Sequence, residues 1–180
     1  MNRLITDLGE LDALFDHYAE RFGRDQTGYR NHVYRVINLV NTLHPLAGDD
    51  LRKLQIAGFF HDAGVWLAGT LDYLGPSVRL ACYYLEQQQR QDWSEEIRQM
   101  IINHHKLTAT GPSPNTLTEA FRRASWIDLT LGLLRFDVAP ERLREIDHRF
   151  PNAGFHAMLA GRVLRHIATR PWRPLPMLKF

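Results

Sequence analysis

Apolar residues recur at intervals of three and four along nearly the whole chain, which is the spacing of one face of an α-helix. No segment shows the alternation of apolar and polar residues, bounded by turn signals, that is typical of a half-buried strand. The pattern predicts an all-α fold, a compact single-domain bundle of about seven to eight helices. We expect helices at about residues 7–22, 26–44, 51–64, 76–91, 94–106, 116–135, 140–148 and 153–169.

Polar residues and prolines mark the ends of several of these helices. The segment "GDD" supplies an N-cap for the third helix, and Ser94 is expected to cap the fifth. Asn115 or Thr116 opens the sixth, beside the loop "TATGPSPNT". Three prolines exclude a helix from the tail at 170–180, which we expect to pack on the same domain. No internal repeat or linker divides the chain, so residues 1–180 are expected to form one domain.

Composition excludes several functional classes. The single cysteine, Cys82, rules out an internal disulfide framework and a thiolate zinc finger, so any metal must be held by His, Asp and Glu. No stretch approaches the roughly 20 apolar residues that cross a bilayer, and the N-terminus lacks the pattern of a signal peptide. We therefore expect a cytoplasmic protein without membrane contact. The net charge of only +2, with no basic run interleaved with aromatics, disfavours nucleic acid as a partner. Formation of a homodimer stays open as an alternative to a monomer.

Four ionisable side chains fall on the apolar faces of four different predicted helices. They are His32 in the second helix, His61 in the third, His104 in the fifth and Asp128 in the sixth. Each one alone is explained at least as well by an ordinary hydrogen bond or ion pair in the core. Together they indicate more, because burying several ionisable groups is costly unless they neutralise one another or surround a cation. Imidazole and carboxylate ligands suit Mn, Fe, Co, Ni or Zn, so the pattern predicts a divalent transition-metal site.

The four segments that carry these residues resemble the HD superfamily of metal-dependent phosphohydrolases. They are "YRNHVYRV", "FFHDAG", "IRQMIINHH" and "RRASWIDLT", and the resemblance spans about residues 29–130. The family signature is a histidine on one helix, a His-Asp pair at the end of another and a distant aspartate on a later helix. The resemblance implies that the metal ligands are His32, His61, Asp62 and Asp128.

Two departures from the family pattern favour one metal ion per chain. Many members carry Lys, His or Glu three residues after the aspartate of the pair, whereas this chain has Val65. Two-metal members place a further histidine between the pair and the later histidines, but positions 63–103 contain none. Asp72 is the nearest substitute for the missing ligand or catalytic base. Capping of the turn before Pro76 explains Asp72 equally well.

Other polar residues near the motifs are assigned from their positions on the helices. His104 is expected to face the interior as a catalytic residue, with a substrate contact or a ligand of a dinuclear variant as alternatives. His105 lies about 100° around the helix and is expected at the rim, in contact with substrate. Arg35 and Lys106 are candidates to bind a phosphate, although an ordinary ion pair explains either as readily. His156 is expected to be a packed helix residue rather than a ligand.

The resemblance implies a metal-dependent hydrolase in which metal-activated water attacks a phosphoester or nucleotide, with a small phosphorylated molecule as substrate. Asp128 or Asp72 would align the water, and His104 would donate a proton to the leaving group. Relatives on this scaffold include diiron oxygenases and a hydratase, here taken to act on a small nitrile- or amide-like substrate, so both stay as alternatives. A non-catalytic helical regulatory module is a third alternative, disfavoured because all four ligand positions are filled.

Overall fold

A computed structural model of the chain describes residues 2–113 and 116–178, and these residues form helices and connecting turns without a strand. Eight of the α-helices have nine residues or more, and the predicted all-α fold is confirmed. The α-helices are α1 (Gly9–His17), α2 (Ala19–Phe22), α3 (Gln26–Leu43), α4 (Asp50–Phe60), α5 (Gly64–Leu67), α6 (Leu74–Gln87), α7 (Ser94–Asn103), α8 (Leu117–Leu129), α9 (Pro140–Arg149) and α10 (Phe155–Thr169). Two short 3-10 helices, η1 (Gly23–Asp25) and η2 (Gln91–Trp93), precede α3 and α7.

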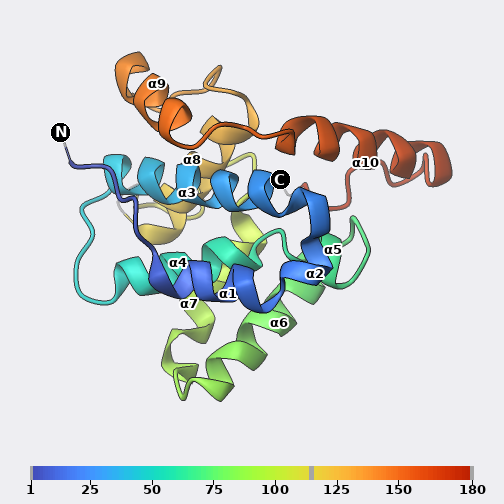
Figure 1. Cartoon of the computed structure of the whole chain (residues 1–180), viewed down its shortest axis with the longest axis horizontal. Coiled ribbons are helices and arrows are strands. Elements are labelled where there is room, and N and C mark those ends of the chain that lie inside the picture. The colour runs from blue at the N-terminus through green and yellow to red at the C-terminus, as the bar shows by residue number, and fades with distance from the viewer. Residues whose placement is uncertain (1, 114–115, 179–180) are drawn as a thin grey trace.

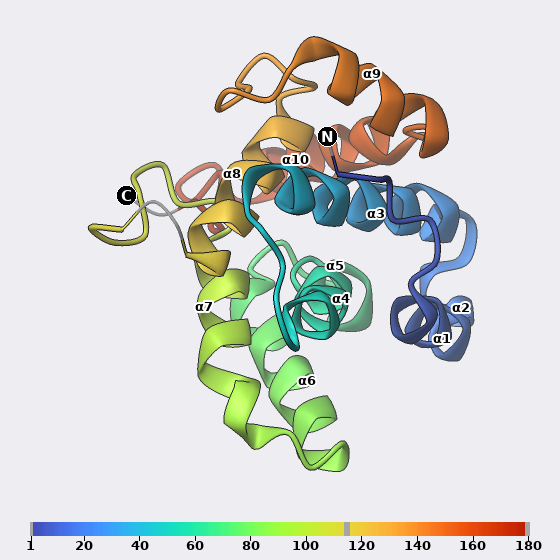
Figure 2. The ribbon, with the colours of Figure 1, turned by 90° about the vertical axis from the view of Figure 1, so that its left-hand side faces the viewer.

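Helix α3 runs through the middle of the molecule (Figure 1). In Figure 2, α9 and α10 lie above α3, α4 and α5 lie below it, and α6 and α7 form the lower end. Helix α3 packs along α8 and against α4, and α7 packs against both α4 and α8. The apolar faces meet in one cluster that extends from Leu8 to Phe155. The four helices predicted to deliver ionisable side chains to the interior therefore surround the same part of the core.

Gly58 allows α4 to cross α3 at close range. A Cβ atom built at Gly58 would lie 2.7 Å from Cγ1 of Val33, which is closer than two carbon atoms pack. Valine is stiff about its first side-chain torsion, so it cannot easily turn away inside a filled core. The close crossing brings the C-terminal end of α4, where His61 and Asp62 follow, next to α3.

The first predicted helix, 7–22, is in fact two helices separated at Tyr18. The backbone of Tyr18 leaves the helical region (φ −103°, ψ 14°) and ends α1. The break turns α2 so that the ring of Phe22 packs 5.5 Å from the ring of Phe15 and 5.7 Å from that of Phe59. These aromatic contacts favour the break over continuation of the local helical pattern.

The three predicted caps have different outcomes. Ser94 is not an N-cap, because η2 runs directly into α7 and makes Ser94 the first helical residue behind the buried Trp93. Thr116 is the N-cap of α8, as predicted, and its hydroxyl accepts a hydrogen bond from the N–H of Glu119. Asn115, the alternative, lies outside the described residues. The "GDD" segment places Asp49 at the N-cap of α4, although its side chain makes no capping hydrogen bond.

Helix α8 ends at Leu129, six residues before its predicted end. Leu131 and Gly132 both adopt positive φ values, 51° and 78°, and the N–H of Gly132 donates to the carbonyl of Ile127. This left-handed turn closes the helix in the way that glycine favours.

The tail after α10 contacts the bundle through Met177, which is buried in a small cluster with Val65, Leu71, Tyr73 and Leu74. Trp172, by contrast, is 80% exposed. The assignment of residues 1–180 to one domain stays a prediction. None of the helices in the described ranges is long and apolar enough to cross a membrane.

Glu119, in the first turn of α8, anchors the segment that follows α7. Its carboxylate accepts hydrogen bonds from Arg122 at 2.7 and 2.8 Å, from Arg123 at 2.9 Å and from the N–H of Thr110 at 3.0 Å. Burial opposes ionisation of this carboxyl, but the partners outweigh it and lower the pKa of Glu119 to about 2. The network fixes the start of the helix that carries Asp128.

Substitution of Gly58 by alanine should destabilise the fold. We expect Gly58→Ala to lower the free energy of unfolding by about 1–3 kcal/mol in urea denaturation, because the new methyl group overpacks the crossing of α3 and α4. Gly161→Ala, on the exposed α10, is the matched control. A Cβ there meets no atom of the described residues within 4 Å. It should leave the fold unchanged or stabilise it by up to about 1 kcal/mol. Equal effects of the two substitutions would contradict the close crossing.

The Glu119 network should make stability depend on acid pH. Below its ordinary pKa the unfolded carboxyl takes up a proton that the folded carboxylate does not, so the free energy of unfolding should fall between about pH 4.5 and pH 2. The contribution of Glu119 is at most about 3 kcal/mol, measurable by urea denaturation across this range. Glu119→Gln should flatten the profile, whereas the exposed Glu86→Gln should not. An equally steep profile in Glu119→Gln would contradict this assignment.

Candidate metal centre

Four elements bring ionisable side chains together in the core. His32 lies in the middle of α3, His61 and Asp62 form the turn after α4, His104 follows the last residue of α7, and Asp128 lies in the last turn of α8. None of the five side chains belongs to a residue more than 6% exposed. Burial on this scale requires that these groups satisfy one another or a cation.

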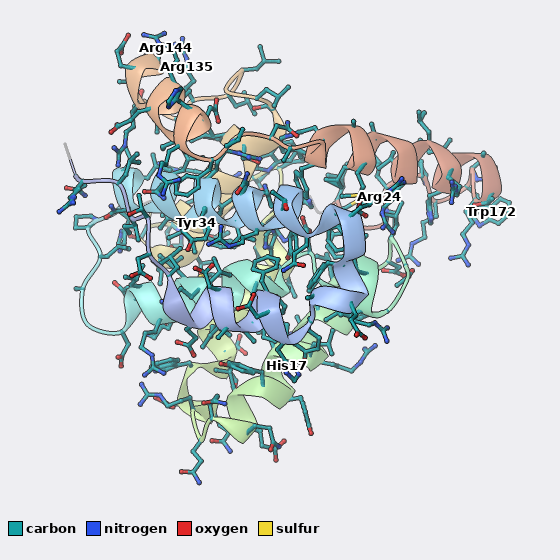
Figure 3. All side chains as sticks on the ribbon, viewed as in Figure 1. His17, Arg24, Tyr34, Arg135, Arg144 and Trp172 are labelled. Carbon is teal, nitrogen blue, oxygen red and sulfur yellow. The ribbon has the colours of Figure 1, made fainter. Side chains whose placement is uncertain are left out.

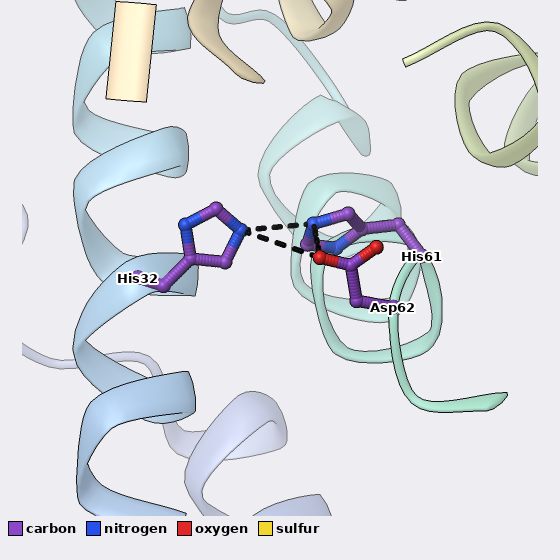
Figure 4. A group of neighbouring side chains, drawn as sticks. All are labelled: His32, His61 and Asp62. Carbon is purple, nitrogen blue, oxygen red and sulfur yellow. Dashed lines mark hydrogen bonds and ion pairs between the residues drawn. The ribbon is translucent and has the colours of Figure 1, made fainter. Parts of the chain in front are cut away.

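His32, His61 and Asp62 point toward one another, as Figure 4 shows. The Nε2 atoms of His32 and His61 lie 3.0 Å apart. Oδ2 of Asp62 lies 3.4 Å from Nε2 of His61 and 3.8 Å from Nε2 of His32. Two nitrogens and one oxygen therefore form a small triangle inside the protein.

The hydrogen bonds of the other imidazole nitrogens fix the tautomers. Nδ1 of His61 lies 2.7 Å from the carbonyl of Gly58, and Nδ1 of His104 lies 2.6 Å from the carbonyl of Ile101. A carbonyl oxygen only accepts, so both Nδ1 atoms carry a proton. Nδ1 of His32 lies 2.6 Å from Oδ2 of Asp128 and likewise donates. In the neutral form, each of the three Nε2 atoms then presents a lone pair to the interior.

Electrostatics favour the neutral forms of His32 and His104 and the charged forms of the two aspartates. Burial lowers the pKa of His32 to about 4, despite the opposing attraction of Asp128, and burial also lowers the pKa of His104. Burial opposes ionisation of Asp62, but the neighbouring His61 and His104 hold its pKa well below its ordinary value. When both of its histidines are neutral, the triangle consists of two imidazole lone pairs and a carboxylate oxygen.

This donor set fits a divalent metal ion. Two lone pairs 3.0 Å apart repel each other unless a cation or proton lies between them. Oδ1 of Asp62 is buried and accepts no hydrogen bond from any described residue. Atoms about 2.1 Å from one tetrahedral ion are about 3.4 Å from each other, which agrees with the triangle. The histidines are also oriented through their Nδ1 atoms, as metal-bound histidines usually are.

A second group shares Asp62. Asp62, His104 and His105 offer three more donor atoms within 4.8 Å of one another. Nε2 of His104 lies 3.3 Å from Oδ1 of Asp62 and 3.4 Å from the hydroxyl of Tyr73. Nδ1 of His105 is buried without a hydrogen-bond partner among the described residues, and burial lowers the pKa of this imidazole well below its ordinary value. Asp62 therefore lies between two clusters of nitrogen ligands.

Asp128 contacts the cluster through His32 rather than joining the triangle. Its Oδ2 accepts from Nδ1 of His32, and its two oxygens also accept from the guanidinium of Arg35. Arg35 donates in addition to the carbonyl of Phe150 at 3.0 Å, and Nε2 of His156 donates to the backbone oxygen of Asp128 at 2.9 Å. Arg35 is thus engaged by protein groups, which does not support its predicted role in binding phosphate.

Two further predicted site residues lie away from the cluster. The carboxylate of Asp72 pairs with Arg173 of the tail at 3.0 Å and is about half exposed. The ammonium of Lys106 donates to the nearby carbonyl of Ala109. Neither side chain belongs to the two candidate metal-binding groups, and the roles predicted for Asp72 and Lys106 stay predictions. The position of Asp72 depends on its ion pair with the tail, and that of Lys106 depends on the path of the loop after α7. Local sequence determines neither.

Three aromatic residues complete the surroundings and were not among the predicted site residues. The hydroxyl of Tyr29 donates to the carbonyl of Phe59 at 2.6 Å and accepts from the N–H of Asp62 at 3.2 Å, which holds the turn that carries the His-Asp pair. The ring of Phe155 stacks on His32 with centroids 4.2 Å apart. Tyr73 lies beside His104. Only Tyr29 carried a signal, since it precedes His32 by three residues on the same face of α3.

A pocket of about 200 Å³ lies beside Asp128, and its lining includes none of His32, His61, Asp62 and His104. Arg35, Asp128, Asp147, Asn152 and His156 provide its polar lining, and leucine and isoleucine side chains provide the rest. This volume accommodates a small molecule or part of one.

Comparison with known proteins agrees with the motifs. The family model described as HD domain matches residues 29–147, a range that includes all five ionisable residues of the centre. No curated protein and no solved structure matches the chain. The match covers more than half of the sequence and confirms the resemblance seen in the four motifs. With its buried histidines and aspartates in the order that this family requires, the chain belongs to the HD domain family.

Proposed function

We propose that this protein is a metal-dependent hydrolase of the HD type that acts on a small phosphoester or nucleotide. One observation carries the proposal: the Nε2 atoms of His32 and His61 and a carboxylate oxygen of Asp62 converge in the core, while the Nδ1 atoms of both histidines already donate to protein oxygens. Membership of a family that consists mostly of metal-dependent hydrolases supports the same conclusion. We assign the metal to His32, His61 and Asp62.

Asp128 belongs to the proposed centre as the residue that orients His32. Its carboxylate fixes the Nδ1 proton of His32 and is itself held by Arg35. Its direct ligation, which the resemblance implied, would require the carboxylate to leave one of these partners. A divalent ion bound at the three ligands would bring the pKa of a water molecule toward neutrality and offset negative charge on a phosphoryl oxygen.

His104 is the best-placed residue for proton transfer. Its Nε2 lone pair lies 3.4 Å from the Tyr73 hydroxyl and 3.3 Å from Asp62, and its Nδ1 proton is held by a carbonyl. The hydroxyl of Tyr73 can therefore donate a hydrogen bond to Nε2 of His104. Because this Nε2 carries no proton of its own, it would accept the proton that the attacking water loses and then donate it to the leaving-group oxygen. We propose His104 as the catalytic acid and Tyr73 as the group that holds its ring and proton in place.

The group formed by Asp62, His104 and His105 supports a dinuclear centre as the second candidate. In that case His104 would be a ligand, and its loss would remove one ion rather than a proton donor. We favour one ion per chain, since only the triangle of His32, His61 and Asp62 shows two imidazole nitrogens facing each other at 3.0 Å. Metal stoichiometry separates the two arrangements.

Metal binding should stabilise the fold through Asp62. At free metal about 100-fold above its Kd, the gain is about 2.7 kcal/mol, which corresponds to a rise in Tm of roughly 5–10 °C. We expect chelator-treated protein to regain this rise in differential scanning calorimetry when Mn, Fe, Co, Ni or Zn is added. Asp62→Ala should lose most of the rise. The control Asp72→Ala removes a carboxylate outside the cluster and should retain it. Loss in both variants, or in neither, would contradict the site.

His104→Ala should separate catalysis from metal binding. We expect it to keep close to one metal ion per chain by elemental analysis, while kcat falls about 100-fold or more, the usual effect of removing a positioned acid or base. Activity is assayed on a panel of phosphomonoesters, phosphodiesters and nucleotides, with small nitriles and amides included. The exposed His148→Ala is the control and should keep both metal and activity. Two ions in the wild type and one in His104→Ala would favour the dinuclear arrangement. Turnover of nitriles or amides alone would overturn the phosphohydrolase.

A further inference from the structure

A groove of about 600 Å³ lies between the start of α3 and the outer helix α10, away from the metal centre. Its lining contains none of the histidines or aspartates of the centre. Small residues leave it open, because Gly28, Ala153 and Gly154 form one side and Ala157 and Gly161 form another. Its volume falls within the range of sites that bind small organic ligands.

Three arginines line this groove. Arg24 extends from η1 and lies close to α10 in Figure 3, and its side chain is 98% exposed. Arg162 lies on α10, and both guanidiniums lie within 4 Å of the same carboxylate, that of Asp25. Arg165 follows Arg162 by three residues and so shares its helix face. The guanidinium of Arg165 forms no ion pair with any described residue.

The acidic groups nearby do not neutralise this cluster. Asp25 is the only carboxylate among the residues that line the groove, against three arginines. Its Oδ2 already accepts from the indole N–H of Trp66 at 3.0 Å and from Arg162 at 3.2 Å. No aspartate or glutamate follows Asp147 in the sequence. The lining of the groove therefore carries a net positive charge.

The positive region continues beyond the groove. An adjoining hollow of about 320 Å³ shares Arg162 and Arg165 and adds Arg170 and His166. Arg170, like Arg165, forms no ion pair within the described part of the chain. The guanidinium of Arg162 also lies 5.3 Å from the centroid of the Trp66 ring, which helps to hold it at the groove.

We propose that this arginine groove binds an organic di- or triphosphate of nucleotide size. Guanidinium groups bind phosphate oxygens through paired, charge-assisted hydrogen bonds, and several of them are needed for a ligand with more than one phosphate. The open space beside Gly161 and Ala157 provides room for the organic part. The site is separate from the metal centre and does not depend on the function proposed above.

Calorimetric titration of metal-free full-length protein with ATP and with pyrophosphate tests the proposal. We expect both to bind, with affinity that falls as salt rises. Arg165→Gln should weaken both by about tenfold, the scale of one charge-assisted hydrogen bond. Arg144→Gln removes an exposed arginine on α9 and should leave both affinities unchanged. Equal weakening by Arg165→Gln and Arg144→Gln would overturn the groove as the site.

Filling the groove without changing its charge gives a second test. Gly161→Leu projects a side chain into open space, so ATP should bind at least about fivefold more weakly while the smaller pyrophosphate keeps its affinity. Gly161→Ala is the matched control and should bind both normally. Unchanged ATP binding in Gly161→Leu would mean that charge alone attracts the ligand, and would overturn the proposal.

Two outcomes separate this site from the metal centre. Asp62→Ala should bind ATP as tightly as the wild type. If ATP binding requires added metal or is lost in Asp62→Ala, the phosphates bind at the metal centre and the groove proposal fails, while the proposed hydrolase stands. If an oligonucleotide binds and ATP and pyrophosphate do not, the groove proposal also fails.

Discussion

The hydrogen bond from Nδ1 of His32 to Asp128 joins α3 to α8 and determines which nitrogen of His32 faces the interior. Arg35 holds the same carboxylate from one turn further along α3. The ion pair keeps Asp128 charged in the core, and the charged carboxylate keeps a proton on Nδ1 of His32. Nε2 of His32 is thereby left with a lone pair facing that of His61. The cost of burying four polar groups is offset only if this whole arrangement forms together.

Helical periodicity predicted much of this architecture because it records which side of a helix is buried. The inward positions of His32, His61, His104 and Asp128 all follow from apolar neighbours three and four residues away. Periodicity, however, depends only on nearby residues, whereas the partner that a side chain contacts can lie far away in the sequence. Asp128 and His32 are 96 residues apart, so the pairing of their side chains depends on the crossing of two helices rather than on either sequence segment.

Two predictions failed where a contact outside the predicted helix outweighed the local signal. Ser94 has the chemistry of an N-cap, yet the preceding 3-10 turn places it one residue inside the helix. Tyr18 ends a helix that the pattern would continue, because Phe22 gains aromatic contacts. Each case depends on a contact that no sequence window of one helix contains.

Through Phe155, the segment that follows the family match contacts the candidate metal centre. Phe155 lies at the start of α10, beyond residue 147, where the family match ends, and its ring covers one face of His32. The same residue lines the arginine groove on its other side. Residues 29–147, which match the family model, therefore do not by themselves cover the imidazole of His32. The basicity of His32, and with it the hold on any cation, therefore depends partly on a helix that lies outside the matched segment.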